Sequence, residues 1–201
     1  MDDRSAQLYR AAAELFVERG YRDVDVVDIT GRCGVSPGTF YNYFRNKRDV
    51  LELILGKGID GLVQAAAAAG DATTTTGRGA FFAELEARMR AILQYIADNA
   101  DVMAFVAFTA PGLDDAAYRS ALNGYWELSA QFTALLSTGR RRGWIRQDVD
   151  LQIAGQVVVS CLVTAALPVL LGEVVDEFDA AEVAATCCTY LLGGMRSLLP
   201  G

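Results

Sequence analysis

Residues 36–47 contain the side chains of this sequence that are best suited to bind a nucleic acid. Ser36 and Pro37 form a helix start, because a hydroxyl group can cap a helix whose first position accepts proline. Phe40 and Phe44 are four residues apart, so they share one helix face and are predicted to point inward. The candidate contact residues around them are Ser36, Pro37, Gly38, Thr39, Tyr41, Asn42, Tyr43 and Arg45.

The outward residues have the chemistry that reads duplex DNA. The Asn42 amide can pair with an adenine, and Thr39 can contact a phosphate or a thymine methyl group. The two tyrosine hydroxyls can bind phosphates. Lys47 stands at the start of the next helix, where a cation opposes the helix dipole unless an anion lies beside it. We therefore predict that Lys47 binds a DNA phosphate; a solvated lysine is the alternative.

Three short helices are predicted to position this face. Apolar spacing and glycine stops place them at residues 5–20, 25–34 and 37–44. The third helix would be about 12 Å long at 1.5 Å per residue, which suits a major groove of about 12 Å. Because only Gly34-Val35-Ser36 joins the second helix to the third, the pair is predicted to be a helix-turn-helix.

Helical periodicity continues through the rest of the chain, and strand signals are almost absent. A fourth helix begins after Asn46. Further helices are expected at residues 80–98, 100–110, 114–138, 149–171 and 179–198. The predicted fold class is all-α, with a three-helix DNA-binding head at residues 1–50 and a larger helical domain at residues 51–201.

Charge and cysteine content set limits on function. The net charge of −7 argues against a nucleic-acid binder, but residues 1–50 balance eight basic against eight acidic side chains. The excess acid therefore lies outside the predicted head. The four cysteines have no disulfide spacing and are expected to be free thiols in the cytoplasm. The acidic N-terminus has no apolar signal segment.

Residues 151–172 carry no charge and are long enough to cross a membrane. Gln152, Gln156 and Ser160 interrupt this stretch, and acidic residues bracket it. A helix buried between its own domain and a partner subunit is therefore favoured over a membrane span.

Two segments match the sequence patterns of enzyme motifs but lack the surrounding elements that those motifs need. Residues 34–38 match G-x-S-x-G, but that motif needs a preceding strand and a histidine, and the chain has no histidine. Residues 56–61 match G-x-G-x-x-G without a βαβ unit around them. The lack of histidine also removes most catalytic zinc sites. We expect no enzyme activity, no metal and no cofactor.

The first 50 residues resemble the TetR family of transcription regulators. The resemblance lies in Ala12-Ala13-Glu14-Leu15-Phe16, Gly20-Tyr21, Asp28-Ile29, the run from Gly34 to Phe44, and Asn46-Lys47. It implies an all-helical homodimer with a DNA-binding head and a ligand-binding body. It also implies DNA contacts at the positions of Thr39, Tyr41, Tyr43 and Lys47, and a four-helix dimer interface from residues 149–171 and 179–198.

One departure from the family pattern bears on docking. Where the family often has two threonines before the second helix, this chain has Val24 and Asp25. Asp25 can cap the helix, but its charge would repel a nearby phosphate.

The expected function is a ligand-responsive regulator that binds a pseudo-palindromic operator and is released by a small molecule. Repression is the expectation that the resemblance implies. A ligand-independent architectural DNA-binding protein is the alternative. Aromatic and polar residues of the body are candidates to line the ligand site: Arg90, Tyr95, Phe105, Phe108, Tyr125 and Gln131.

Overall fold

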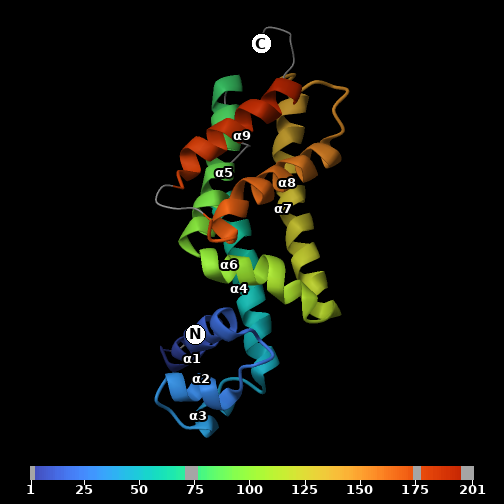
Figure 1. Ribbon diagram of the computed structural model, residues 1–201. Helices are drawn as coiled ribbons and strands as arrows, with labels where there is room; N and C mark the ends of the chain where they lie inside the picture. Colours follow the sequence, from blue (N-terminus) through green and yellow to red (C-terminus); the bar gives the residue numbers. More distant parts are fainter. Residues whose placement is uncertain (1–2, 71–76, 174–177, 196–201) are drawn as a thin grey trace. The chain divides into compact units, whose positions relative to one another are not determined.

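A computed structural model describes residues 3–70, 77–173 and 178–195, and these residues are almost entirely helical, which confirms the all-α prediction (Figure 1). The α-helices are α1 (Asp3–Arg19), α2 (Val26–Arg32), α3 (Pro37–Tyr41), α4 (Lys47–Ala68), α5 (Arg78–Asp98), α6 (Ala100–Ala104), α7 (Asp115–Arg141), α8 (Leu151–Leu170) and α9 (Ala180–Met195). A π-helix (Phe105–Thr109) and a 3₁₀ turn (Ala110–Gly112) lie between α6 and α7.

The chain divides into two compact units. The first unit comprises residues 1–59 and 101–121, and the second comprises residues 60–100 and 122–201. This division differs from the boundary expected at residue 50, because a segment from the middle of the chain joins the head. The helices α4 and α7 each contribute residues to both units.

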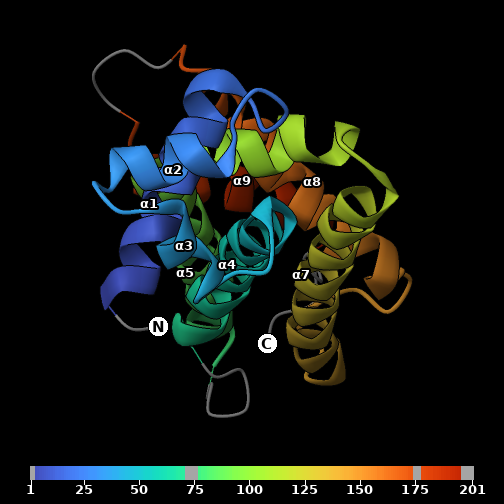
Figure 2. The same ribbon diagram turned by 90° about the horizontal axis from the view of Figure 1, so that it is seen from below.

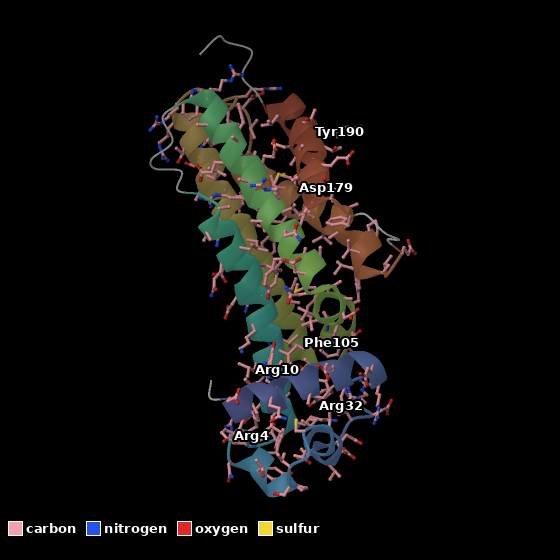
Figure 3. The ribbon with its side chains drawn as sticks, turned by 90° about the vertical axis from the view of Figure 1, so that its left-hand side faces the viewer. Arg4, Arg10, Arg32, Phe105, Asp179 and Tyr190 are labelled. Carbon is pink, nitrogen blue, oxygen red and sulfur yellow. The ribbon has the colours of Figure 1, made fainter. Side chains whose placement is uncertain are left out.

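The first unit gathers α1, α2 and α3 around the first turns of α4 (Figures 1 and 2). Phe16 and Phe40 are fully buried in its core, as their spacing predicted. Phe105 of the π-helix enters the same core, 6.2 Å from the Phe16 ring, and lies against α1 (Figure 3). Gly20 adopts a φ of 84°, a left-handed conformation that ends α1 and brings Tyr21 back onto Phe16, with ring centroids 5.1 Å apart.

The helix α3 is shorter than predicted. It ends at Tyr41 rather than Phe44, and residues 42 and 43 form a turn. The amide groups of Tyr43 and Phe44 both donate to the Phe40 carbonyl, each at 3.0 Å. This tightening ends the helix because the chain must turn at once into α4, where the Asn46 side chain accepts the Asp49 amide at 3.0 Å.

In the second unit, α5 lies beside α8 and α9 (Figure 1). Gly155 permits a close crossing of α8 with α7, since a β-carbon there would lie 2.3 Å from Thr133 Oγ1 and 2.6 Å from the Ser129 carbonyl oxygen. The Asp150 carboxylate caps α8 by accepting the amides of Gln152 and Ile153.

The helix α8 is long and apolar enough to span a membrane by length and composition alone. It nevertheless buries Leu151, Val158, Leu162 and other residues within the second unit. We interpret α8 as a core helix with one uncharged outer face, in agreement with the interpretation from sequence.

Candidate nucleic-acid interface

The α3 region presents the outward face that helical spacing predicted. Phe40 and Phe44 are buried, whereas Tyr41 and Tyr43 expose 58% and 40% of their surfaces. Thr39 is half-buried, and the remaining candidates are exposed: Ser36, Pro37, Gly38, Asn42 and Arg45. The structure therefore brings these candidates together on one short, largely uncharged surface.

Ser36 occupies the N-cap position of α3, with an extended backbone, and Pro37 follows at the first helical position. The Ser36 hydroxyl does not accept a backbone amide, as a simple cap would. It lies 3.2 Å from the Thr39 hydroxyl instead, and the Thr39 amide donates to the Ser36 carbonyl at 2.9 Å. Both hydroxyls are thus held together at the start of the helix.

Arg45 is paired within its own segment. Its guanidinium donates to both carboxylate oxygens of Asp49, from Nε at 2.8 Å and from Nη2 at 3.0 Å. The same bonding lowers the pKa of the Asp49 carboxyl from its usual value. Since the Arg45 side chain is 85% exposed, a phosphate can still reach it, but only in competition with Asp49.

Lys47 makes contacts within the protein, and its contact with a DNA phosphate stays a prediction. Its ammonium donates to the carbonyl oxygen of Tyr21 at 2.6 Å and to that of Val24. It also lies 4.4 Å from the centroid of the Tyr21 ring. In this arrangement the ammonium fastens the connection between α1 and α2 to the start of α4, and its donors face the protein.

Two acidic residues stand at the start of α2. Asp25 is its exposed N-cap residue, and the Asp28 carboxylate accepts the Asp25 amide at 2.8 Å. Arg19 approaches Asp28 at 3.5 Å. The predicted capping position of Asp25 is therefore confirmed, and its carboxylate adds negative charge next to the helix start.

Other cations of the first unit are also engaged by acids. Arg32 donates to Glu18 at 2.9 and 2.6 Å and to Glu14 at 3.4 Å, which lowers the pKa of Glu18. Arg48 pairs with Asp114 and, at 3.2 Å, with Glu52. Their local pairing reduces the electrostatic field that the head presents to DNA.

Comparison with known proteins bears on this arrangement. Residues 8–54 match the family model described as "Bacterial regulatory proteins, tetR family". Over nearly the whole chain, the fold is that of FadR from Bacillus halodurans, with a TM-score of 0.79, 21% identity and coverage of 96% of this chain and 97% of the other.

Residues 8–54 are therefore similar to the TetR family of bacterial regulatory proteins.

Two relatives and one further structure extend the comparison. The transcriptional activator FasR of Mycolicibacterium smegmatis is 37% identical over 86 residues, 43% of this chain and 39% of FasR. The repressor KstR2 of Rhodococcus jostii is 27% identical over 157 residues, 75% of this chain and 72% of KstR2. FadR from Bacillus subtilis in complex with stearoyl-CoA has a TM-score of 0.74 at 18% identity, covering 94% and 98% of the two chains. The matched segment spans less than half the length of FasR.

The names of FasR and KstR2 describe transcription regulators. Within the described residues, no group of three acidic or cysteine side chains could hold a metal ion.

The six candidate ligand residues are divided between the two units. Phe105 and Phe108 belong to the first unit, where Phe105 is core and Phe108 is 48% exposed. Phe105 and Phe108 both line a cavity of about 290 Å³ in the first unit, and the Phe105 ring lies 6.2 Å from that of Phe16. Arg90 is exposed on α5.

The other three candidates lie inside the second unit. The Tyr95 ring fills the space where a side chain at Gly61 would stand, and burial raises the Tyr95 pKa. The Tyr125 hydroxyl lies 3.3 Å from both the Gln156 carbonyl oxygen and the Ser160 hydroxyl. The Gln131 amide donates to the Val63 carbonyl at 3.4 Å, while its Oε1 is buried and accepts no hydrogen bond among the described residues.

Proposed function

We propose that this chain is a ligand-responsive transcriptional regulator that binds a pseudo-palindromic operator as a homodimer. The observation that carries the proposal is the exposed, hydrogen-bonding face of α3, which lies within the residues matched by the family model. A two-fold dimer would insert two α3 helices into successive major grooves about 34–36 Å apart.

We assign base reading to Asn42 and phosphate contacts to Thr39, Tyr41 and Tyr43. An asparagine amide can donate and accept together at the adenine edge, which gives sequence preference. Tyrosine and threonine hydroxyls bind phosphates and fix the register. Lys47 supports these contacts indirectly, because its ammonium holds the carbonyl oxygens of the α1–α2 connection.

The homodimer is proposed to form through residues 149–171 and 179–198. The outer face of α8 carries Ile153 and Val157, which are 54% and 46% exposed, and no charged residue. On α9, Tyr190 is 82% exposed and projects from the helix (Figure 3). Burying an apolar side chain stabilises association by about 1.5–3 kcal/mol, so this face favours a protein partner over water.

The proposed effector is an apolar molecule linked to a group with amide N–H donors, such as a fatty acyl-CoA. The likeness to a FadR bound to stearoyl-CoA suggests this class. A hydrogen-bond donor of the ligand could pair with the Gln131 Oε1, which accepts no hydrogen bond among the described residues. Such pairing is favourable because an unsatisfied buried acceptor destabilises the protein by about 1–3 kcal/mol. Turning the amide over would set its oxygen against the Val63 carbonyl, so one side stays unsatisfied in either orientation.

Repression is the proposed direction of regulation, because a dimer bound across a promoter excludes polymerase without further contacts. Among the relatives, KstR2 is named a repressor and FasR an activator. Access to the chromosome places the protein in the cytoplasm.

The first experiment is selection of genomic fragments by the purified protein at moderate salt, followed by sequencing. We expect a short inverted repeat to be enriched. Sequence-blind, salt-sensitive binding would instead favour the architectural alternative, and no binding at all would overturn the proposal.

The second experiment uses fluorescence anisotropy with the selected duplex. Stearoyl-CoA should dissociate the protein from the DNA. Stearate and free coenzyme A are the matched controls, because each contains only one half of the ligand. Gln131→Leu should weaken the response to stearoyl-CoA without changing operator affinity. A ligand-free operator complex that none of the three compounds releases would contradict the acyl-CoA assignment.

A further inference from the structure

The cavity of the first unit lies between the end of α1 and the segment formed by α6 and the π-helix, where Phe105 faces α1 (Figure 3). Its volume of about 290 Å³ is close to the lower limit of small-molecule sites, about 300 Å³. The α1 wall consists of Phe16, Val17 and Gly20, and the opposite wall consists of Asp101, Ala104, Phe105, Phe108 and Thr109. We call this space the α1–π cavity.

Irregular backbone on both walls leaves the α1–π cavity open. Gly20 ends α1 with a φ of 84° and has no side chain to fill the space beside it. On the opposite wall, residues 105–109 form a π-helix, a rare conformation that is frequently found at functional sites. Val17 and Phe108 keep a large part of their surfaces exposed. The first unit therefore leaves aromatic and aliphatic surface at the cavity in contact with water.

The electrostatics of the α1–π cavity favour a cation. The Asp101 carboxylate lines the cavity and has no ion pair or hydrogen bond among the described residues. The C-terminal end of α1 adds roughly half a negative charge. Among the described residues no lysine or arginine lines the cavity, and Arg19 at the end of α1 approaches Asp28 at 3.5 Å. The faces of phenyl rings also attract cations.

Asp101 has an alternative role in α6, because an acidic residue in the first turn of a helix balances the helix dipole. The helix has only five residues, however, and no backbone amide of the described residues donates to Asp101. Asp114 behaves as a cap should, since it accepts the amides of Ala116 and Ala117 at 2.9 Å. The Asp101 oxygens therefore remain available to a ligand.

We propose that the α1–π cavity binds a small organic cation, an ammonium group that carries an apolar or aromatic substituent. The ammonium would lie between the Asp101 carboxylate and the phenyl rings of Phe105 and Phe108. An anion would be repelled by Asp101 and by the end of α1, and a neutral molecule would leave the carboxylate unpaired. The site is separate from the proposed acyl-CoA effector, which is an anion, and it does not depend on operator binding.

Benzyltrimethylammonium is the probe, because it combines a permanent positive charge with an aromatic ring. Benzenesulfonate is the matched anion. Binding of each compound to the full chain is measured by titration calorimetry at low salt, where charges are little screened. We expect the cation to bind at least about ten-fold more tightly than the sulfonate. Equal affinities, or no binding of the cation, would overturn the proposal.

A matched pair of aspartates locates the probe. Asp101 and Asp115 are both exposed, and each lies in the first turn of a helix of the first unit, but only Asp101 lines the α1–π cavity. Asp101→Asn should raise the Kd of benzyltrimethylammonium about five-fold. Asp115→Asn should change it by less than about two-fold. Equal effects of the two substitutions would indicate a general attraction to an acidic protein and would overturn the site.

Phe108→Leu tests the contribution of the rings. Leucine keeps an apolar side chain at this half-exposed position but removes the aromatic face. The Kd of benzyltrimethylammonium should rise about two- to five-fold, and circular dichroism should show an unchanged fold. If Phe108→Leu and Asp101→Asn both left the Kd at the wild-type value, the probe would bind elsewhere and the proposal would be wrong.

Discussion

Replacing Lys47 by alanine distinguishes two roles for this side chain. Its ammonium forms two hydrogen bonds to carbonyl oxygens and lies over the Tyr21 ring. Hydrogen bonds from a charged donor contribute about 1.5–3 kcal/mol each, and the ring adds about 0.5–1 kcal/mol. Ordering a lysine side chain costs about 2 kcal/mol, and the freed carbonyls regain water. We therefore expect Lys47→Ala to lower the free energy of unfolding by about 2 kcal/mol.

Operator binding should weaken as well, by a similar factor for every DNA sequence, because the α1–α2 connection is no longer fixed. The dependence of the logarithm of affinity on the logarithm of salt concentration should stay unchanged. A lysine bound to phosphate would instead contribute about 0.9 to that slope. Urea unfolding and anisotropy titrations between about 50 and 200 mM salt measure both quantities.

Lys57 provides the control, since its ammonium also lies 4.4 Å from an aromatic ring, that of Tyr9, on the same helix α4. Lys57→Ala should cost less than about 1 kcal/mol. If Lys47→Ala reduced the salt slope by about one unit while stability stayed at the wild-type value, the positioning role would be refuted and the phosphate contact restored.

Four further predictions follow from single residues. Asn42→Ala should change the bases enriched in a binding selection; an identical motif would exclude base reading by this residue. Asp25→Thr should tighten operator binding several-fold at low salt, because it removes a negative charge beside the DNA; weaker binding by a folded variant would reveal a contact made by Asp25. Gly155→Ala should destabilise the protein by about 1–3 kcal/mol in urea, since the methyl group would lie 2.3 Å from Thr133 Oγ1, whereas Gly56→Ala, with open space around it, should not. Hydrogen bonds from the Ala117 amide and from Arg48 lower the pKa of the Asp114 carboxyl. The contribution of Asp114 to stability is therefore present above the unfolded pKa of about 3.9 and is lost as the pH falls below that value. The difference in Tm between the wild type and Asp114→Asn should shrink from pH 7 to pH 3, and a constant difference would contradict this.

If the proposed function holds, the paired cations of the head should favour selective DNA binding. Arg45 and Arg32 are both paired with carboxylates, which lowers their attraction for non-specific DNA. Weak attraction to phosphates lowers the affinity for every DNA sequence by a similar factor. Specific contacts from α3 would then account for a larger share of the binding energy, and effector release would need a smaller change in affinity.

The sequence by itself determined the local structure. Helix spacing, proline and glycine placed the helix-turn-helix and the buried faces of Phe40 and Phe44. The carboxylates of Asp114 and Asp179 likewise accept backbone amides only two or three residues away. Such signals depend on neighbours along the chain, so a single sequence contains them.

Tertiary structure alone decided where distant groups meet. Lys47 reaches carbonyl oxygens that precede it by 23 and 26 residues, and Arg48 meets Asp114 across 66 residues. The Phe105 ring lies 6.2 Å from that of Phe16, a contact between distant segments of the chain that helix spacing does not predict. The close crossing of α7 and α8 at Gly155 likewise joins residues that are distant in the sequence. Periodicity tells which face of a helix is apolar, but only packing determines what covers that face.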